Sequence, residues 1–249
     1  MKEKIDTIPI HDAFLSGDEC PFCYLERMAE QNTVRYVLGP SASYMEPDVR
    51  GVTDREGFCA HHFKMMYDYG NSLGNALIMQ TYYSGLLAQL EQQIADFTLP
   101  GKHPFFGKRK ETDEPILLWA KDKAQSCFIC SRLAYHMRRY CSAFFAMLGD
   151  PEFRTQVENS KGFCMHHFSF LLEQAHEKLK NSDREWFYST VLKLMKDNLE
   201  RVKGDIDHFV SMFDYRSAGK DWKNSKDAVS RGMQKLSGIH PADPPYKAD

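Results

Sequence analysis

Apolar residues recur at steps of three and four along most of the chain, and this spacing predicts helices throughout. The clearest example is the stretch 73–97, whose face consists of Leu73, Leu77, Gln80, Ser84, Leu87, Leu90, Ile94 and Phe97. Such a face is typical of a helix packed on a core, so we expect it to be buried. The alternation that would indicate strands is almost absent. The pattern therefore predicts an all-α protein.

A second long helix is expected after Ser182-Asp183-Arg184-Glu185, a capping box in which the Ser and Glu side chains would bond amides at the helix start. Its apolar face steps through Val191, Met195, Leu199, Val202, Ile206, Phe209 and Phe213. Four shorter helices are expected to start at cysteines, because apolar positions of helical spacing follow Cys20, Cys59, Cys127 and Cys164. Pro21, directly after Cys20, suits the first position of a helix.

An internal duplication is built around a seven-residue motif. Gly57-Phe58-Cys59-Ala60-His61-His62-Phe63 returns as Gly162-Phe163-Cys164-Met165-His166-His167-Phe168. A Cys-x-x-Cys pair lies upstream of each copy, at Cys20 and Cys23 and again at Cys127 and Cys130. The two copies are offset by 107 residues from Cys20 to Cys127 and by 105 residues from Cys59 to Cys164. Matched spacing over such a distance indicates that both halves carry the same kind of site.

The duplication divides the chain into two helical repeats, at residues 1–100 and 113–215, followed by a basic helix and extended tail at 216–249. The stretch 98–115 separates the repeats, because it gathers prolines, glycines and four basic residues. Phe105-Phe106 within it is expected to dock on the helices. Each repeat ends in one of the two long helices, and we expect these two helices to pack together.

The thiol and imidazole groups have the spacing of a metal site. A Cys-x-x-Cys places two sulfurs on one turn, and at a helix start residues i and i+3 share a face whereas i and i+2 do not. We therefore choose His62 over His61 and His167 over His166. Three thiolates and one imidazole form a closed tetrahedral set that suits Zn²⁺. Taking each repeat by itself, the expected metal ligands are Cys20, Cys23, Cys59 and His62, and then Cys127, Cys130, Cys164 and His167. A site whose ligands cross between the two halves stays open.

Two Zn²⁺ ions per chain are thus the expected cofactors, each pinning one repeat. An iron–sulfur cluster is the alternative, although all-cysteine ligation is commoner for such clusters. A dithiol redox role for the Cys-x-x-Cys pairs also stays open, but the βαβ context typical of that chemistry is missing.

Two histidines of the motifs, His61 and His166, remain outside the ligand sets. Each either hydrogen-bonds a nearby carbonyl or carboxylate in support of the site, which we favour, or acts as a general base or as a ligand for a second ion. Cys141 lies on an apolar helix face and is expected to be a small buried residue. An apolar jacket around the two sites is expected from Phe58, Phe63, Phe163 and Phe168.

Taken together, the motifs support a family resemblance over nearly the whole chain. Cys20-Pro21-Phe22-Cys23-Tyr24-Leu25-Glu26-Arg27, the two Gly-Phe-Cys-x-His-His-Phe copies and Trp222-x-x-Ser225-Lys226-Asp227-Ala228 resemble an uncharacterised bacterial protein family of about this length. Some of its members are labelled ABC-transporter substrate-binding protein, a label that does not fit a chain lacking an export signal. The resemblance implies no particular activity.

Charge and composition indicate where in the cell the protein is expected and which partners are not expected. The formal net charge is −2, so no overall field draws the protein to nucleic acid or to a membrane. Met1-Lys2-Glu3-Lys4-Ile5-Asp6 has no apolar segment of a secretory signal, and no run reaches the roughly 18 apolar residues of a spanning helix. A cytoplasmic location is expected, where thiols stay reduced and clustered cysteines more often bind metal than form disulfides.

The expected function is that of a binding or scaffold module for a protein or small-molecule partner, because both metal sites are coordinatively full. Whether the protein is an enzyme stays open, since no phosphate-binding glycine loop, Gly-x-Ser-x-Gly or His-Glu-x-x-His is present. An iron-containing redox protein is the alternative. A second alternative is a nucleic-acid or acidic-partner binder that uses the basic helix expected near 220–236, with Trp222, although nucleic acid is the less expected partner.

Overall fold

The computed structural model describes residues 7–99 and 114–241. The expected docking of Phe105-Phe106 lies outside the described residues, as do all four basic positions of the linker and the last eight residues of the tail.

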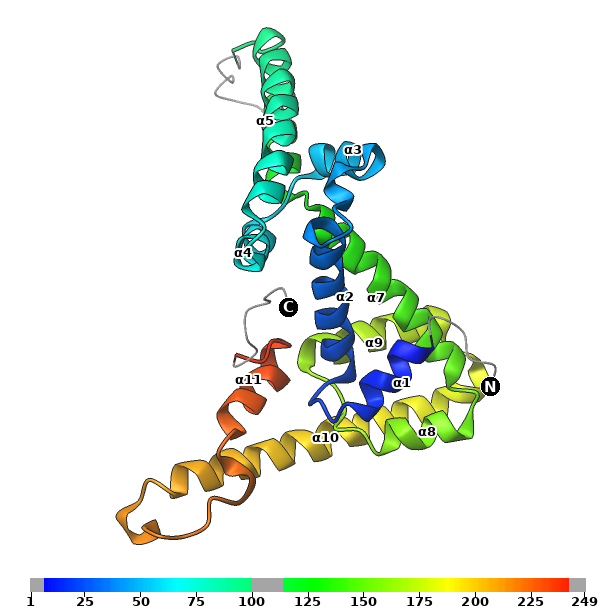
Figure 1. Ribbon diagram of the computed structural model, residues 1–249. Helices are drawn as coiled ribbons and strands as arrows, with labels where there is room; N and C mark the ends of the chain where they lie inside the picture. Colours follow the sequence, from blue (N-terminus) through cyan, green and yellow to red (C-terminus); the bar gives the residue numbers. More distant parts are fainter. Residues whose placement is uncertain (1–6, 100–113, 242–249) are drawn as a thin grey trace, which may run out of the picture. The chain divides into compact units, whose positions relative to one another are not determined.

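Every regular element in the described part of the chain is helical, which confirms the all-α prediction (Figure 1). Three short 3-10 turns, η1 (Ser43–Met45), η2 (Tyr215–Ser217) and η3 (Lys223–Ser225), accompany the α-helices. The α-helices are α1 (Ile8–Leu15), α2 (Pro21–Leu38), α3 (Pro47–Glu56), α4 (Ala60–Tyr69), α5 (Ser72–Ala95), α6 (Pro115–Gln125), α7 (Phe128–Met147), α8 (Pro151–Glu158), α9 (Met165–Lys178), α10 (Asn181–Ser211) and α11 (Ala228–Ser237). None of these helices combines the length and apolar character that crossing a bilayer requires.

The described residues form two compact units that differ from the repeats drawn from the sequence. The first unit consists of residues 7–29 and 135–241, and the second of residues 30–99 and 114–134. Both boundaries fall inside helices, α2 and α7, and not in the stretch 98–115. The reason is that each Cys-x-x-Cys helix starts among elements of the other repeat, so a repeat of the sequence is not a unit of the fold.

Aromatic side chains fill the core of the first unit. Phe144 lies at its centre, with ring centroids 5.6 Å from Phe22, 5.8 Å from Phe153 and 6.3 Å from Phe163. The second unit has a more aliphatic core, formed by Val34, Val37, Leu38, Phe58, Met66, Ile78, Cys127, Phe128 and Ile129. Both cores include the phenylalanine next to a Cys-x-x-Cys cysteine, so hydrophobic packing and the thiol groups meet at the same helix ends.

The two long helices differ in what they bury. Val191, Met195 and Val202 of α10 are buried, as their face predicts. The corresponding prediction for α5 is wrong, since Leu87 is 56% exposed and Ile94 60% exposed. The helices also belong to different units: α5 packs on α3, α4 and α6, whereas α10 packs on α11 and η3.

The start of α10 also differs from the expected capping box. The helix begins at Asn181, and its N-cap residue Lys180 makes no side-chain cap. Asp183 is instead buried inside the first turn, where its carboxylate accepts a hydrogen bond from Arg154 at 2.6 Å. An ion pair within the first unit therefore replaces the local cap.

The C-terminal basic segment is largely occupied with internal contacts. Its helix, α11, begins at Ala228 and not near Lys220, and it packs on α10 and α9. Arg231 and Lys235 are buried. Arg231 donates to Asp205 and Asp227, each at 2.9 Å. These two cations neutralise carboxylates inside the first unit and do not form part of an exposed basic face.

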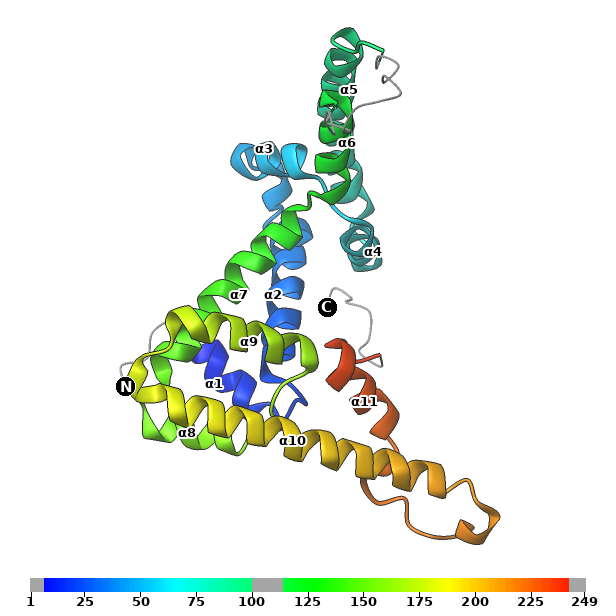
Figure 2. The same cartoon turned by 180° about the vertical axis from the view of Figure 1, so that it is seen from behind.

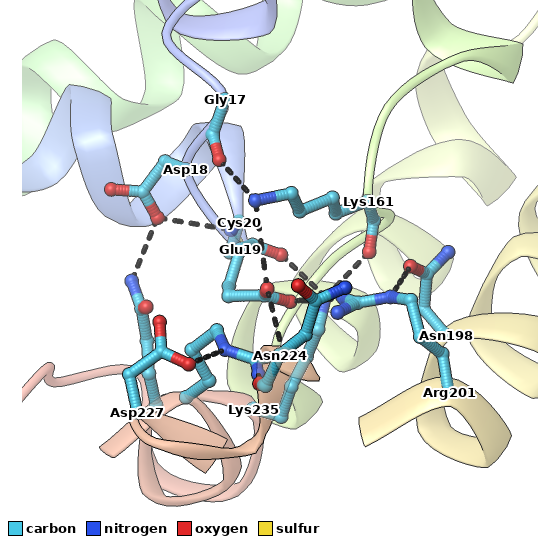
Figure 3. Close-up of polar contacts among 12 residues, drawn as sticks. Gly17, Asp18, Glu19, Cys20, Lys161, Asn198, Arg201, Asn224, Asp227 and Lys235 are labelled. Atoms are coloured by element: carbon cyan, nitrogen blue, oxygen red, sulfur yellow. Dashed lines mark hydrogen bonds and ion pairs between the residues drawn. The ribbon is translucent and has the colours of Figure 1, made fainter. Parts of the chain in front are cut away.

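Lys235 ties α11 to the loop that leads into Cys20 (Figure 3). Its ammonium group donates to the backbone carbonyls of Glu19 and Lys161 and lies 3.4 Å from the Glu19 carboxylate. Arg201 of α10 donates to the same carboxylate at 2.5 Å. Burial lowers the pKa of Lys235, while the negative charge of Glu19 opposes that change. This buried network fixes three segments of the first unit at one point.

Replacing Lys235 by Met should lower the free energy of unfolding by about 3–5 kcal/mol, because it leaves two buried carbonyls without their donor and removes one of the cations around the buried Glu19 carboxylate. Lys196→Met is the control, since Lys196 is an exposed residue of α10 whose ion pair with Glu200 is separated by 3.8 Å. Urea unfolding of both variants measures the difference. Equal stability of the two variants would show that the network contributes nothing.

Candidate metal centres

All eight predicted ligands are brought together, but in a crossed arrangement. Cys20 and Cys23 lie with Cys164 and His167, and their four ligand atoms are within 4.8 Å of one another. A second group of the same kind contains Cys59, His62, Cys127 and Cys130. We call these groups the α2/α9 cluster and the α4/α7 cluster. The prediction that each repeat completes its own site is therefore wrong: each Cys-x-x-Cys pair meets the Cys-x-x-His pair of the other repeat.

Each cluster lies within one unit and joins two helix N-termini. The first cysteine of each motif directly precedes the first helical residue, and its carbonyl accepts the first helical hydrogen bond. In the α2/α9 cluster, Tyr24 donates to Cys20 at 3.2 Å and Phe168 donates to Cys164 at 2.8 Å. Because the N-terminus of a helix favours negative charge, two such ends stabilise thiolates where the motifs meet.

The α2/α9 cluster is fully buried. The His167 Nδ1 atom lies 3.5 Å from Cys20 Sγ, 3.4 Å from Cys23 Sγ and 3.3 Å from Cys164 Sγ. The sulfurs of Cys23 and Cys164 are 3.5 Å apart. Tetrahedral zinc, with Zn–S near 2.3 Å and Zn–N near 2.0–2.1 Å, requires separations of about 3.6 Å from sulfur to nitrogen and about 3.8 Å between sulfurs. The donor atoms are thus spaced as ligands of one ion.

The α4/α7 cluster has the same geometry and is more open. The His62 Nδ1 atom lies 3.2 Å from both Cys59 Sγ and Cys127 Sγ and 3.4 Å from Cys130 Sγ. The sulfurs of Cys59 and Cys130 are 3.9 Å apart. All these cysteines are free thiols, and Cys130 is exposed. The donor set again fits a single tetrahedral cation.

The outer nitrogen of each ligand histidine faces a glutamate of α2. His62 Nε2 lies 3.0 Å from Glu30 Oε1, and His167 Nε2 lies 3.5 Å from Glu26 Oε2. A carboxylate in this position fixes the tautomer that leaves Nδ1 free to bind metal. Neither glutamate is among the residues predicted from the sequence. Glu26 follows Cys23 by three residues and Glu30 follows Glu26 by four, so all three lie on one face of the helix. This spacing is the sequence signal that points to the two glutamates.

The first histidine of each motif, His61 or His166, lies beside one of these glutamates and outside the thiol clusters. His61 Nε2 is 3.0 Å from Glu30 Oε1, the same oxygen that His62 contacts. His166 groups with Glu26 and His167 in a similar way. The His61 contact is what a supporting role requires, but both groups of one carboxylate and two histidines also have the spacing of ligands for a second ion, so both roles stay predictions.

The pKa values of the histidine and thiol groups in the α4/α7 cluster are those expected of a site that releases protons when it binds a metal ion. Burial acts to lower the pKa of His62, but hydrogen bonds to Cys127 and Glu30 outweigh it and raise that pKa to about 10. Burial acts to raise the pKa of Cys127, but the hydrogen bond to His62 lowers it to about 6. Burial and the Cys127 charge raise the pKa of Cys130 to about 12. A cation that binds here must displace protons, so acid weakens its binding.

The apolar surroundings of the clusters only partly match the expected jacket. Phe58 and Phe163 are buried, and the Phe58 ring lies 5.4 Å from that of Phe63. Two rings that were not expected in the jacket, Phe22 and Phe128 inside the two Cys-x-x-Cys motifs, are also fully buried next to cysteines. Cys141 is buried as expected, and burial raises the pKa of its thiol to about 12.

Glycines allow backbone to approach both clusters. Gly57 has a φ of +61°, and its carbonyl accepts a hydrogen bond at 2.9 Å from Phe128, which connects the two motifs of the α4/α7 cluster. A Cβ at Gly57 would lie 2.6 Å from the Tyr82 ring of α5. Gly238, at the end of α11, has a φ of +87°, and a Cβ there would lie 3.5 Å from Cys164 Sγ. α11 therefore ends directly against the α2/α9 cluster.

Gly57→Ala should lower the free energy of unfolding by more than about 2 kcal/mol, because a Cβ is strained at positive φ and clashes with Tyr82. Gly51→Ala is the matched control. Gly51 lies inside α3 with open space around it, so this variant should gain up to about 1 kcal/mol from helix propensity. Urea unfolding measures both changes, and destabilisation of the two variants alike would contradict the assignment.

The crossed arrangement has a direct test in metal stoichiometry. Cys20→Ser with Cys164→Ser damages only the α2/α9 cluster, so one metal ion per chain should remain after dialysis. Cys20→Ser with Cys59→Ser damages both clusters, and no tightly bound ion should remain. Pairing within each repeat would give the opposite pattern. Elemental analysis of the two double variants beside the unmodified protein decides between the arrangements.

Comparison with known proteins yields one match. No curated protein matches the chain, and no solved structure does so. A family described as being of unknown function, DUF6062, matches residues 1–243. This match agrees with the motif resemblance to an uncharacterised family. Because it covers nearly the whole chain, the protein belongs to DUF6062.

Proposed function

We propose that this protein is a cytosolic zinc-binding scaffold, in which two Zn²⁺ ions per chain have a structural role and the helices serve as a binding module. The observation that carries the proposal is the closed donor set: each cluster offers three sulfurs and one imidazole nitrogen around a single point. Structural zinc sites are of this kind, whereas catalytic sites keep a position open for water or substrate.

A structural role also follows from what each cluster joins. The ligands come from two helix starts that are far apart in the chain, as in the contact between Cys20 and His167, which are 147 residues apart. Zinc bound by such a set contributes on the order of 10–16 kcal/mol in finger-sized peptides. Free, clustered thiols fit a reducing compartment, which supports the cytosolic assignment.

Iron is the second candidate for the same ligands and would make the protein an electron carrier or redox enzyme. The observation that favours a single ion over an iron–sulfur cluster is the sulfur spacing of 3.5–3.9 Å. Cysteines that bind different irons of a cluster would be further apart. Iron in a four-ligand site thus remains a candidate that the sulfur spacing fits as well as zinc.

Binding of nucleic acid or an acidic partner through the C-terminal segment has weaker support. Arg231 and Lys235 are engaged in buried ion pairs, and Arg216 donates to Asp214 at 2.6 Å. Among the described residues of this segment, the other exposed cations are Lys220, Lys223 and Lys226.

The experiment is elemental analysis of anaerobically purified protein together with its visible spectrum and its melting temperature. We expect two zinc ions per chain, no colour, and a large loss of helicity and melting temperature when a chelator removes the zinc. Helicity restored by added Zn²⁺ would establish the structural role. Iron with visible absorption would overturn the zinc proposal, and unchanged melting after chelation would overturn the structural role.

A further inference from the structure

The helix α5 carries an apolar seam without a partner in the described chain. Its seam positions repeat in heptads, with first positions at 73, 80, 87 and 94 and fourth positions at 76, 83 and 90. Six of the seven residues are exposed and Leu90 is half-buried. These residues are Leu73, Ala76, Gln80, Tyr83, Leu87, Leu90 and Ile94. Apolar residues at such positions are the pattern by which helices pair in a coiled coil.

The seam lies on the side of α5 opposite to the contacts with its own unit. Ile78 is buried in the core of that unit, and Thr81 donates to Asp54 of α3 at 2.6 Å. Tyr82 covers Gly57, and Gln89 accepts a hydrogen bond from Trp119 of α6 at 3.2 Å. At 100° per residue these four positions group on one side of the helix, about half a turn from the seam.

The far part of α5 lacks the burial that keeps a helix stable. From residue 79 to 99 and from 114 to 126 no residue is buried, although α6 runs beside α5 (Figure 1 and Figure 2). Helices in proteins gain most of their stability from packing an apolar face. Leu73 is 68% exposed and Tyr83 59% exposed, so this face of α5 is not buried against the described residues.

Charge indicates which partner fits. Of the 24 residues in α5, Glu91 is the only charged one. Positions that flank a coiled-coil seam usually carry the charges that select a different partner or reject a copy. In α5 the flanking positions hold Leu77, Met79, Ser84, Leu86, Glu91 and Gln93. Two copies of α5 can therefore meet almost without electrostatic repulsion. The absence of Lys and Arg from α5 also argues against an anionic lipid surface.

We propose that α5 pairs with α5 of a second copy of this chain in a parallel, in-register coiled coil. Parallel pairing places the Gln80 amide opposite its own copy, where each amide can donate and accept one hydrogen bond. An antiparallel pair would set this amide against apolar side chains. A single polar residue at a first heptad position is a known means of fixing register.

The seam is long enough for a reversible dimer. At 1.5 Å per residue, 24 residues span about 36 Å, and a helix about 10 Å wide presents about 360 Å² of projected face. Two copies thus cover at least about 700 Å² of projected face, which is below the roughly 1,200 Å² of stable specific interfaces and falls in the range of weak, transient contacts. The dimer is therefore expected to be weak and to dissociate on dilution.

Sedimentation between 1 and 200 μM tests the pairing in the metal-loaded full chain. The unmodified protein should move from the 28.8 kDa of one chain toward twice that mass as concentration rises. Leu87→Glu should weaken association by about 100-fold or more, because two charges would be buried in the seam. Leu192→Glu is the control, since Leu192 lies on α10 and is 52% exposed. It should leave association unchanged.

Several outcomes would overturn the proposal. One is a protein that stays monomeric at every concentration, and another is an equal effect of Leu87→Glu and Leu192→Glu on association. A third is a monomer whose folding Leu87→Glu destabilises, because this would show that the chain itself covers the seam. Register is tested by mild oxidation of Gln80→Cys, which should form a disulfide between chains, whereas Ala88→Cys, off the seam, should not. A dimer that Gln80→Cys fails to crosslink would overturn the parallel register.

Discussion

The convergence of sulfur and imidazole atoms at two points is the constraint on which the rest of the structure depends. Each point joins two helix N-termini, so the local dipoles, the buried rings of Phe22 or Phe128 and the thiol groups all act on the same few residues. If a cluster holds a metal ion, its helix starts cannot slide or rotate without losing the donor geometry. Neighbouring elements then pack directly against these helix starts. Gly57 and Gly238 are examples, because each lets the backbone approach a motif closely.

The α2 helix has a role in both clusters although it supplies thiols to only one. Cys20 directly precedes this helix and Cys23 lies in its first turn, whereas Glu26 and Glu30 each face a histidine of a different cluster. The equivalent positions of α7 after Cys130 hold Leu133 and Met137, so the duplication did not supply these glutamates in pairs. The carboxylates are thus a feature of one helix, and the two clusters are not equivalent copies.

Much of the local structure could be predicted from the sequence, whereas the long-range arrangement could not. Helix starts at Cys20, Cys59, Cys127 and Cys164 follow from apolar spacing, and the choice of His62 and His167 follows from i, i+3 geometry. Both are local properties. Crossing of the motifs depends on which helix ends meet in space, and two identical motifs offer the same ligands in either arrangement. The exposure of the α5 seam was missed for a similar reason, since apolar periodicity indicates a face to be covered but not the molecule that covers it.

Crossed pairing also has a consequence for the order of events during synthesis. On a ribosome, Cys20 and Cys23 emerge long before His167, and the first Cys-x-x-His pair that becomes available to them is Cys59 with His62. Closing the loop from residue 20 to 62 costs about 1 kcal/mol less chain entropy than closing the 147-residue separation to His167. If the clusters bind zinc, as we propose, a growing chain that meets the ion early would therefore be drawn toward the wrong partner first. Productive folding would then depend on ligand exchange at the metal, and the rate at which zinc leaves a mispaired site would set how fast the native arrangement forms.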